Sequence, residues 1–251
     1  MGLAGRVVMI TAAGAGIGRA TAQAFSQAGA KLAVTDIDLA AADAVASEIH
    51  SRGGEAISVQ LDVAREEDAE AAVARIVDRL GRLDVLVNNA GTGARIPTIE
   101  LPTERWRQAL AVGVDGCFFC SRAAGRHMTE CRSGAVVNVA SIMGLSGGGL
   151  YPNLAYHAAK GALVNMTRAL ALEWAPFGIR VNAVAPAFVD TRLVGPLMGD
   201  PAMKSAILNA TPLGQLVSAD EVADSIVFLA SDLASMITGH TLPIDGGWLA
   251  R

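Results

Sequence analysis

The sequence predicts an α/β fold in which a doubly wound, parallel, seven-stranded sheet has helices on both faces. Short β-branched runs alternate along the chain with longer helical stretches, which is typical of a parallel sheet covered on both sides. Several of the short runs are apolar throughout, as expected for strands whose two faces are both buried. The 251 residues contain no internal repeat, low-complexity tract or interdomain linker, so we expect one domain over residues 1–251.

The strands are expected at the apolar, β-branched runs, which are residues 6–11, 31–36, 55–61, 85–88, 135–139, 180–185 and 241–244. The helices are expected between them, at residues 18–28, 39–51, 66–80, 103–128, 156–175 and 219–229. Residues 187–212 interrupt this alternation and contain no clear strand. They follow the carboxyl end of the sixth strand, the edge where ligands bind in open α/β sheets, so we expect a lid over the substrate.

The composition indicates a large buried core and, we expect, a buried subunit interface. Hydrophobic residues make up 52% of the chain and charged residues 18%, and the net charge is −4, so no nucleic-acid or anionic-membrane surface is predicted. The N-terminus lacks the layout of a signal peptide, and no run of about 18 apolar residues suggests a membrane span. We therefore expect a cytoplasmic protein that binds neither nucleic acid nor membrane.

The cysteines predict neither a disulfide framework nor a metal site. The chain has three, an odd number. Cys117 and Cys120 form a C-x-x-C, which can support redox or metal chemistry, but no second ligand pair lies nearby and the histidines are scattered. We interpret both residues as small buried hydrophobes.

A glycine-rich turn follows the first predicted strand and leads directly into an amphipathic helix. Glycine lets the backbone approach a pyrophosphate, whose charge is stabilised by the free N–H groups of a helix N-terminus. The spacing differs from the common G-x-G-x-x-G fingerprint, but the position after the first strand predicts a dinucleotide site. The residues expected to bind the cofactor here are Thr11, Gly14, Gly16, Ile17 and Gly18.

The end of the second predicted strand indicates which dinucleotide binds. A carboxylate at this position, Asp36, can accept hydrogen bonds from both ribose hydroxyls of an adenosine, and it would repel a 2′-phosphate. No Arg or Lys follows it closely, so we expect NAD rather than NADP, with Asp36 and Ile37 at the cofactor. Asp38 is better suited to be the N-cap of the next helix.

Tyr156 and Lys160 are four residues apart, and Ser141 lies upstream of them. On a helix, positions i and i+4 share one face, so the phenol and the ammonium point the same way. A neighbouring lysine favours the phenolate and lowers the tyrosine pKa, which lets the tyrosine exchange a proton with an alcohol or carbonyl oxygen. A serine hydroxyl from an adjacent element could hold the same oxygen.

From residue 5 to residue 249, the ordered motifs resemble the short-chain dehydrogenase/reductase family, whose fold is Rossmann-like. The motifs are the turn at 11–18, Asp62-Val63, Asn88-Asn-Ala-Gly91, Asn138-Val-Ala-Ser141, Tyr156-x-x-x-Lys160, Ile179-Arg-Val-Asn182, Pro186-Ala-Phe-Val-Asp-Thr191 and Asp245-Gly-Gly247. The resemblance implies an NAD(H)-dependent oxidoreductase that interconverts a secondary alcohol and a ketone. An NADPH-linked carbonyl reductase and a catalytically weak NAD-binding relative are the alternatives.

The resemblance also implies roles for single residues. Tyr156 is the acid/base, Ser141 holds the substrate oxygen, and Lys160 lowers the tyrosine pKa while it binds the nicotinamide ribose. A homotetramer, or a homodimer, would pair through the helices at 103–128 and 156–175. The further cofactor contacts that the resemblance implies are Asp62, Val63, Asn89, Ala90, Gly91, Pro186, Val189 and Thr191.

The chain departs from the family pattern at Ala12 and Ala187, where glycine is usual, and at Gly113, where the family has a catalytic asparagine. In the family, that asparagine holds a water between the catalytic lysine and solvent. Asp115 lies about 200° further around a helix and cannot take its place. We therefore expect a water in the vacated space and a reduced rate of turnover.

The substrate itself is not predicted. The segments that would contact it, residues 92–102, 146–154 and 187–212, suggest an apolar or mixed cleft rather than one for a strongly anionic substrate. Tyr151 is expected to line the cleft or pack beneath it. Arg95 and Arg192 add positive charge to these segments and are equally well explained as solvated side chains.

Overall fold

In the computed structural model, which describes residues 1–191 and 194–250, seven strands form one sheet in the order β3-β2-β1-β4-β5-β6-β7. All neighbouring strands are parallel, as predicted. Arg192 lies outside the described residues. The strands are β1 (Val7–Ile10), β2 (Lys31–Asp36), β3 (Glu55–Gln60), β4 (Val85–Asn88), β5 (Gly134–Val139), β6 (Ile179–Pro186) and β7 (Thr241–Ile244).

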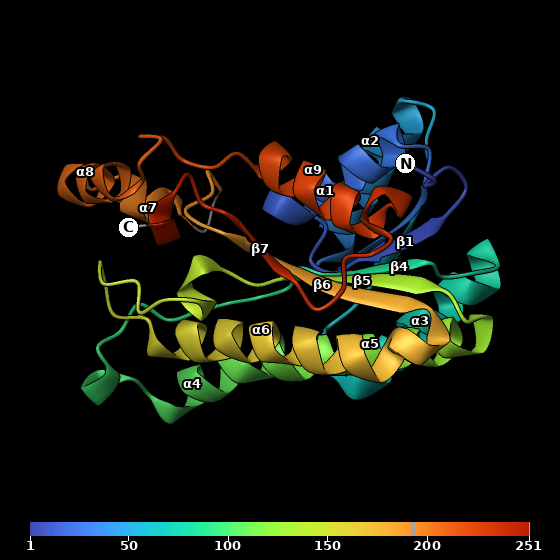
Figure 1. Cartoon of the computed structure of the whole chain (residues 1–251), viewed down its shortest axis with the longest axis horizontal. Helices are drawn as coiled ribbons and strands as arrows, with labels where there is room; N and C mark the ends of the chain where they lie inside the picture. The colour runs from blue at the N-terminus through green and yellow to red at the C-terminus, as the bar shows by residue number, and fades with distance from the viewer. Residues whose placement is uncertain (192–193, 251) are drawn as a thin grey trace.

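Helices cover both faces of the sheet (Figure 1). One layer contains α1 (Gly16–Gln27), α2 (Leu39–Ser51) and α9 (Ala219–Ala230). The opposite layer contains α3 (Glu66–Leu80), α4 (Thr103–Leu110), α5 (Gly116–Cys131) and α6 (Leu154–Trp174). This arrangement confirms the doubly wound α/β fold that the alternating pattern predicts.

The central strands are buried on both faces, which explains why they are apolar throughout. In β1, Val8 and Ile10 pack into the core beneath α1, α2 and α9. Val7 and Met9 point the other way, into the core beneath α3, α5 and α6. Side chains alternate between the faces of a strand, so both sets of positions must be hydrophobic here.

The single helix expected over residues 103–128 is wrong, because the chain interrupts it. A π-helical turn, Ala111–Asp115, separates α4 from α5. Glycine and β-branched residues, such as Gly113 between Val112 and Val114, are poor helix formers and make this interruption easier. A Cβ on Gly113 would lie 3.1 Å from the Cβ of Ala159 on α6, so glycine also permits a close approach of the two segments.

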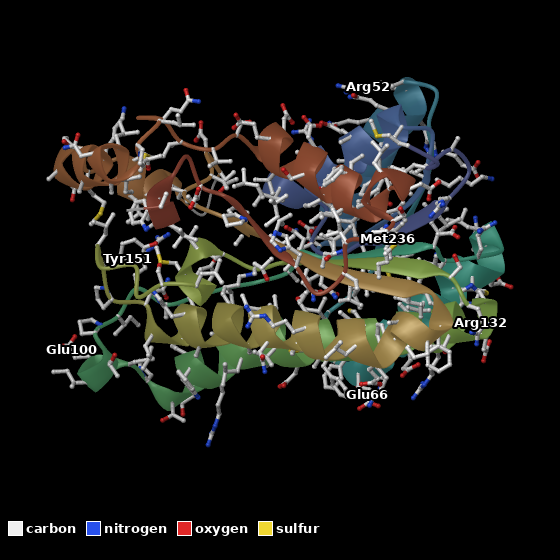
Figure 2. The ribbon with its side chains drawn as sticks, viewed as in Figure 1. Arg52, Glu66, Glu100, Arg132, Tyr151 and Met236 are labelled. Carbon is white, nitrogen blue, oxygen red and sulfur yellow. The ribbon has the colours of Figure 1, made fainter. Side chains whose placement is uncertain are left out.

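The segment at 187–212 is largely helical, with α7 (Gly195–Met198) and α8 (Pro201–Ala210). It begins with a bridge between Val189 and Val217. Leu197 and Ile207 from the two helices share an apolar cluster with Ile142, which follows β5. Figure 2 shows Tyr151 at this end of the molecule and Arg132 at the opposite end.

The remaining sequence expectations concern the cysteines, metals and membranes. Cys117 and Cys120 are buried free thiols, and burial raises their pKa values to about 11 and about 12, as suits inert core residues. Within residues 1–191 and 194–250, no group of three or more His, Cys, Asp or Glu is arranged to hold a metal. No helix of the described chain is both long enough and apolar enough to span a membrane.

Candidate active site

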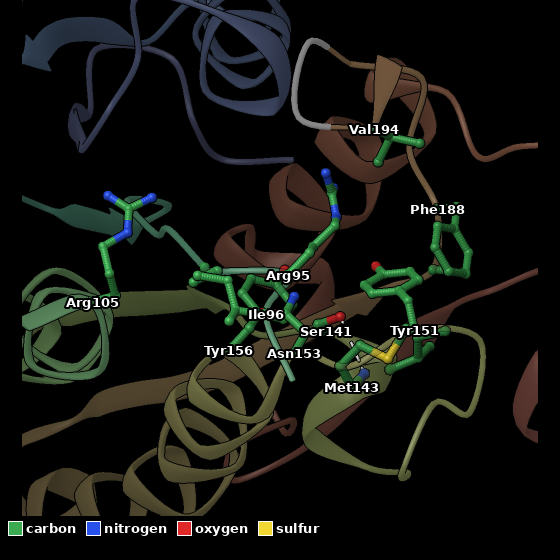
Figure 3. A pocket seen from close by; sticks show the side chains of 14 residues that line it. Arg95, Ile96, Arg105, Ser141, Met143, Tyr151, Asn153, Tyr156, Phe188 and Val194 are labelled. Carbon is green, nitrogen blue, oxygen red and sulfur yellow. Dashed lines mark hydrogen bonds between the residues drawn. The ribbon is translucent and has the colours of Figure 1, made fainter. Parts of the chain in front are cut away.

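Two adjoining hollows lie at the carboxyl ends of the strands and meet at Tyr156. The first, which we call the substrate cavity, has a volume of about 210 Å³. The second, the cofactor groove, has a volume of about 320 Å³. The substrate cavity is lined by Gly93, Ala94, Arg95, Ile96, Arg105, Ser141, Ile142, Met143, Tyr151, Asn153, Tyr156, Ala187, Phe188 and Val194 (Figure 3). The groove is lined by Ala12, Ala15, Gly16, Ile17, Asn89, Gly91, Val139, Ala140, Tyr156, Lys160, Pro186, Ala187, Val189, Thr191 and Val194.

The structure brings Ser141, Tyr156 and Lys160 together. Ser141 follows the end of β5, and the other two lie one turn apart on α6. The hydroxyl of Ser141 lies beside the phenol of Tyr156, whose pKa it lowers, and donates a hydrogen bond of 3.4 Å to the carbonyl of Pro186. The ammonium of Lys160 lies 5.5 Å from the centre of the Tyr156 ring and donates a hydrogen bond of 2.6 Å to the carbonyl of Val139. The predicted shared helix face therefore forms, with the serine beside it.

The electrostatics differ from the prediction that Lys160 lowers the Tyr156 pKa. Burial raises the pKa of Tyr156 to about 12, and the neighbouring hydroxyl of Ser141 and the charge of Arg95 only partly oppose this shift. Lys160 does not offset it, because its ammonium lies over the ring face and is directed to Val139. Burial also lowers the pKa of Lys160 to about 8, since a charged group is disfavoured in a buried site.

The glycine-rich turn fits a pyrophosphate. The N-cap of α1 is Ala15, which offers no side-chain cap, and the first turn contains no acidic residue. The N–H groups of this helix end are therefore available to an anion, as the sequence predicts. Gly16 has a φ of +54°, a left-handed conformation that favours glycine, and its Cα faces the groove.

Thr11 connects the glycine-rich turn to the end of β4 through hydrogen bonds. Its Oγ1 accepts hydrogen bonds from the N–H groups of Asn89 (2.9 Å) and Ala90 (3.0 Å). The side-chain amide of Asn89 donates in return to the carbonyls of Thr11 and Ala12. The backbone N–H groups of Asn89 and Ala90 are thus occupied within the protein, and these residues shape the groove.

Two further glycines of the turn act through close packing. A Cβ on Gly18 would lie 2.3 Å from the carbonyl oxygen of Ala12. A Cβ on Gly14 would lie 2.6 Å from the Cβ of Ala41 on α2. Neither residue lines the groove, so their contribution is to let α1 and α2 approach the turn.

Asp36 is fixed at the end of β2 by two backbone donors. Its Oδ2 accepts from the N–H of Gly14 at 2.9 Å, and its Oδ1 accepts from the N–H of Asp38 at 3.1 Å. Asp38 caps α2 by accepting from the N–H groups of Ala40 and Ala41, as expected. Beyond Asp36, Ile37 is 62% exposed and offers an apolar surface.

The residues after β3 lie outside the lining of the groove. Asp62 accepts a hydrogen bond from the N–H of Ala64 at 3.0 Å, which forms a tight turn. Val63 is buried, and a Cβ on Gly116 of α5 would lie 2.8 Å from its side chain. The structure therefore explains Val63 through packing against α5.

Elsewhere along the groove, Gly91 leaves room for Lys160. A Cβ at Gly91 would lie 3.1 Å from Lys160 Nζ. Pro186, Val189 and Thr191 also line the groove, and their contact with a cofactor stays a prediction.

The single residues predicted to bind the cofactor omit several that line the groove, which are Ala15, Val139, Ala140 and Val194. The segments expected to contact the substrate include Gly93 and Asn153 but omit Arg105, Ile142 and Met143, which also line the cavity. Arg105 has no signal in the sequence, since an arginine in the first turns of a polar helix usually faces solvent.

A network of buried polar side chains links the strands that end at the site to the helices that pack against them. The side-chain amide of Asn88 donates to the hydroxyl of Ser121 and to Oδ1 of Asn138, both at 2.9 Å. Asn138 donates in turn to the hydroxyl of Thr167 at 2.9 Å. These bonds join β4 and β5 to α5 and α6, so they hold the strand that ends at Ser141 against the helix that contains Lys160.

Known proteins share both the sequence and this geometry. A family model described as enoyl-(acyl carrier protein) reductase matches residues 11–249. A cis-4-hydroxycyclohexanecarboxylate dehydrogenase from Sinomonas cyclohexanicum is 40% identical over 246 residues, which cover 98% of this chain and 97% of that protein. The chain belongs to the short-chain dehydrogenase/reductase family. Like other members of this family, it is an oxidoreductase that acts on CH–OH groups with a nicotinamide dinucleotide.

Two other members of the family extend the comparison. A meso-2,3-butanediol dehydrogenase from Serratia marcescens is 39% identical over 245 residues, which cover 96% of this chain and 94% of that protein. The crystal structure of a gluconate 5-dehydrogenase from Burkholderia cenocepacia in complex with NADP and tartrate has a TM-score of 0.96 at 32% identity. The match covers 100% of this chain and 97% of that one.

Within the family pattern, the departures at Ala12 and Gly113 now have a structural description. Ala12 adopts a φ of 50°, a conformation that costs a non-glycine residue about 1–2 kcal/mol. Gly113 is buried in the π-helical turn, and among the described residues a Cβ there would meet only the Cβ of Ala159, at 3.1 Å. The helix α6 therefore lies close to the glycine on this side, and the water expected beside Gly113 stays a prediction.

Proposed function

We propose that the protein is an NAD(H)-dependent oxidoreductase that interconverts a secondary alcohol and a ketone, with Tyr156 as the acid/base. The neighbouring hydroxyls of Ser141 and Tyr156 carry this proposal, because both residues line the substrate cavity and Tyr156 also lines the cofactor groove. An oxygen bound between the two hydroxyls would place its carbon at the mouth of the groove. The names of the relatives, which denote dehydrogenases of a cyclic hydroxycarboxylate, a diol and a sugar acid, support a small alcohol as substrate.

Each residue of the triad has a separate task. The Ser141 hydroxyl donates a hydrogen bond to the substrate oxygen and orients it. In oxidation, the Tyr156 oxygen accepts the proton of the alcohol, and in reduction it returns a proton to the forming alkoxide. Lys160, held by Val139, contributes positive charge beside the groove. The nicotinamide, when bound, exchanges a hydride with the substrate carbon.

The direction of the Tyr156 pKa shift predicts how the rate depends on pH. Because burial raises this pKa, the residue stays protonated through neutral pH and is ready to donate in reduction. Oxidation requires the deprotonated form, so its rate should increase as pH rises, whereas reduction should not.

NAD is the proposed cofactor in preference to NADP. The fixed carboxylate of Asp36 supports this choice, since it would accept from ribose hydroxyls and repel a 2′-phosphate. Neither Ala15 in the turn nor Ile37 after β2 could pair with a phosphate. The NADP in the structure of the gluconate 5-dehydrogenase makes an NADPH-linked carbonyl reductase the alternative.

We also propose that residues 187–212 cover the bound substrate and that the protein is a homotetramer or homodimer. Ala187, Phe188 and Val194 border the cavity, which supports the covering role. Phe118 on α5 is 45% exposed and Leu172 on α6 is 81% exposed, which supports pairing through these helices.

The Tyr156→Phe variant tests the proposed function. We expect its turnover to fall by about 100- to 10,000-fold, the range typical of a lost acid/base group, with NADH affinity unchanged. NADH absorbance measures turnover on a panel of secondary alcohols, and quenching of protein fluorescence measures NADH binding. Retained turnover would overturn the proposed mechanism. If the wild type binds NADH but oxidises no alcohol, the chain is the catalytically weak relative instead.

A further inference from the structure

We infer that the alcohol oxidised by this enzyme carries a carboxylate, which Arg95 and Arg105 bind in the substrate cavity. This inference names the substrate class and therefore rests on the proposed function. Both arginines line the cavity, one from the loop after β4 and one from α4, and Figure 3 shows Arg105 on its helix some way to the side of Arg95. The guanidinium of Arg105 also donates to the side chain of Gln108 at 3.1 Å. Arginine binds carboxylates well because its planar guanidinium offers several donors in a fork.

The charges around the cavity favour an anion. The described lining contains two cations and no Asp or Glu, although the chain as a whole has a net charge of −4. A concave, partly apolar site of one sign raises the local concentration of ligands of the opposite sign. The cavity therefore has an electrostatic preference that the molecule as a whole lacks.

Arg95 is placed close to the reacting atoms. Its guanidinium lies 5.4 Å from the centre of the Tyr151 ring, a cation–π contact that helps to orient it within the cavity. Its charge also acts on the Tyr156 phenol, whose pKa it lowers. A carboxylate on Arg95 would thus lie near the substrate oxygen that Ser141 and Tyr156 hold.

Asn153 provides an independent sign that a polar ligand fills this cavity. The residue is 7% exposed and lines the cavity, and its Oδ1 is buried without a hydrogen-bond partner in the described part of the chain. A buried acceptor left unsatisfied costs about 1–3 kcal/mol, so a ligand that donates to it gains affinity. Gly93 keeps this position open, since a Cβ there would lie 3.1 Å from Asn153 Oδ1.

The rest of the cavity limits the size and polarity of the ligand. Its volume is about 210 Å³, which admits a small molecule. Ile142, Met143 and Phe188 provide an apolar wall on the lining. The lining is mixed, as expected from the sequence. Its two cations depart from the expectation that the cleft does not suit a strongly anionic substrate, and they suit one carboxylate on a compact carbon skeleton.

Paired substrates test the inference with the holoenzyme and NAD. The probes are 3-hydroxybutyrate against 3-hydroxybutyramide, D-gluconate against sorbitol, and 4-hydroxycyclohexanecarboxylate against its carboxamide. We expect at least one carboxylate to be oxidised with a kcat/KM about 10- to 100-fold above that of its neutral partner, because a charge-assisted hydrogen bond is lost in the neutral compound. The KM of that carboxylate should also rise with ionic strength.

Variants then assign the effect to the two arginines. Arg105→Gln should raise the KM of the carboxylate about tenfold or more, with little change for the neutral partner. Arg95→Gln should raise the same KM to a similar extent, and it should also slow the oxidation of both substrates, because the Tyr156 pKa rises when this charge is lost. Arg107→Gln is the matched control, because Arg107 is an exposed arginine of α4 outside the cavity lining. It should leave both substrates unaffected.

The outcomes separate the two proposals. If neutral alcohols are oxidised as efficiently as carboxylates, the carboxylate inference is overturned and the proposed function stands. If no compound of either kind is oxidised, binding tests the inference separately. In calorimetry, cyclohexanecarboxylate should bind the enzyme–NAD complex and cyclohexanecarboxamide should not. Equal binding of both would contradict the inference even in the absence of turnover.

Discussion

The cofactor groove and the substrate cavity share Tyr156 but are built in different ways. The groove is lined mainly by backbone and by small or apolar side chains, such as those of Ala12, Gly16 and Ala140. The cavity instead receives long polar side chains, among them Arg95, Arg105 and Tyr151. A backbone surface suits a ligand that many proteins share, whereas side chains on loops can be exchanged without changing the sheet.

The cofactor groove is built from motifs that the family shares, whereas the substrate cavity is built from side chains that are particular to this chain. The groove depends on hydrogen bonds between the ends of neighbouring strands, such as those from Asn89 and Ala90 to Thr11. The cavity depends on the convergence of the loops after β4 and β5 with α4 and the start of α6. Loss of these hydrogen bonds in the groove should therefore affect stability and cofactor binding together. Changes to cavity residues other than Ser141 and Tyr156 should affect mainly the choice of substrate.

Thr11→Val should have the largest effect on the groove. The substitution keeps the shape but removes Oγ1, which leaves the N–H groups of Asn89 and Ala90 unsatisfied. Each such group costs about 1–3 kcal/mol, so we expect a loss of about 2–4 kcal/mol in the free energy of unfolding and weaker NADH binding. Urea denaturation and fluorescence titration measure the two effects. Thr11→Ser, which retains the oxygen, should remain close to the wild type.

Gly113→Asn tests the junction between the two regions. The added side chain would press against Ala159, which lies between Tyr156 and Lys160 on α6. Overpacking of this kind costs about 1–3 kcal/mol, so both stability and kcat should fall. Ala159→Gly in the same chain should restore part of each. A kcat above that of the wild type would instead show that the lack of asparagine at position 113 slows the enzyme, and that the water held by this asparagine in the family speeds turnover.

Asp36→Ala should act mainly on cofactor choice, and it should also lower stability, because the N–H groups of Gly14 and Asp38 lose their acceptor. Removing the carboxylate relieves repulsion of a 2′-phosphate, so the ratio of NADP to NAD efficiency should rise about tenfold or more, equal to about 1.4 kcal/mol. Steady-state kinetics with each cofactor measures this ratio. Asp38→Ala is the control, since that carboxylate caps α2 and should change stability without changing the ratio. An unchanged ratio in Asp36→Ala would reverse the assignment of NAD.

Local patterns allowed much of the site to be predicted. The spacing of Tyr156 and Lys160 places them on one helix face whatever surrounds them, and the turn at 11–18 joins a strand to a helix at a ligand-binding edge. The alternation of apolar runs likewise determined a parallel sheet. These features depend on periodicity and chain geometry, which act over a few residues.

Only the tertiary structure decided the features that depend on contacts between distant segments. The π-helical turn at Gly113 forms where it meets Ala159, and the pKa of Tyr156 is set by its burial rather than by the neighbouring Lys160. Arg105 and Asn153 became part of the site because α4 and α6 bring them to one cavity. The sequence by itself thus determined the chemistry and the cofactor edge, whereas packing between elements decided the electrostatics and the shape that selects the substrate.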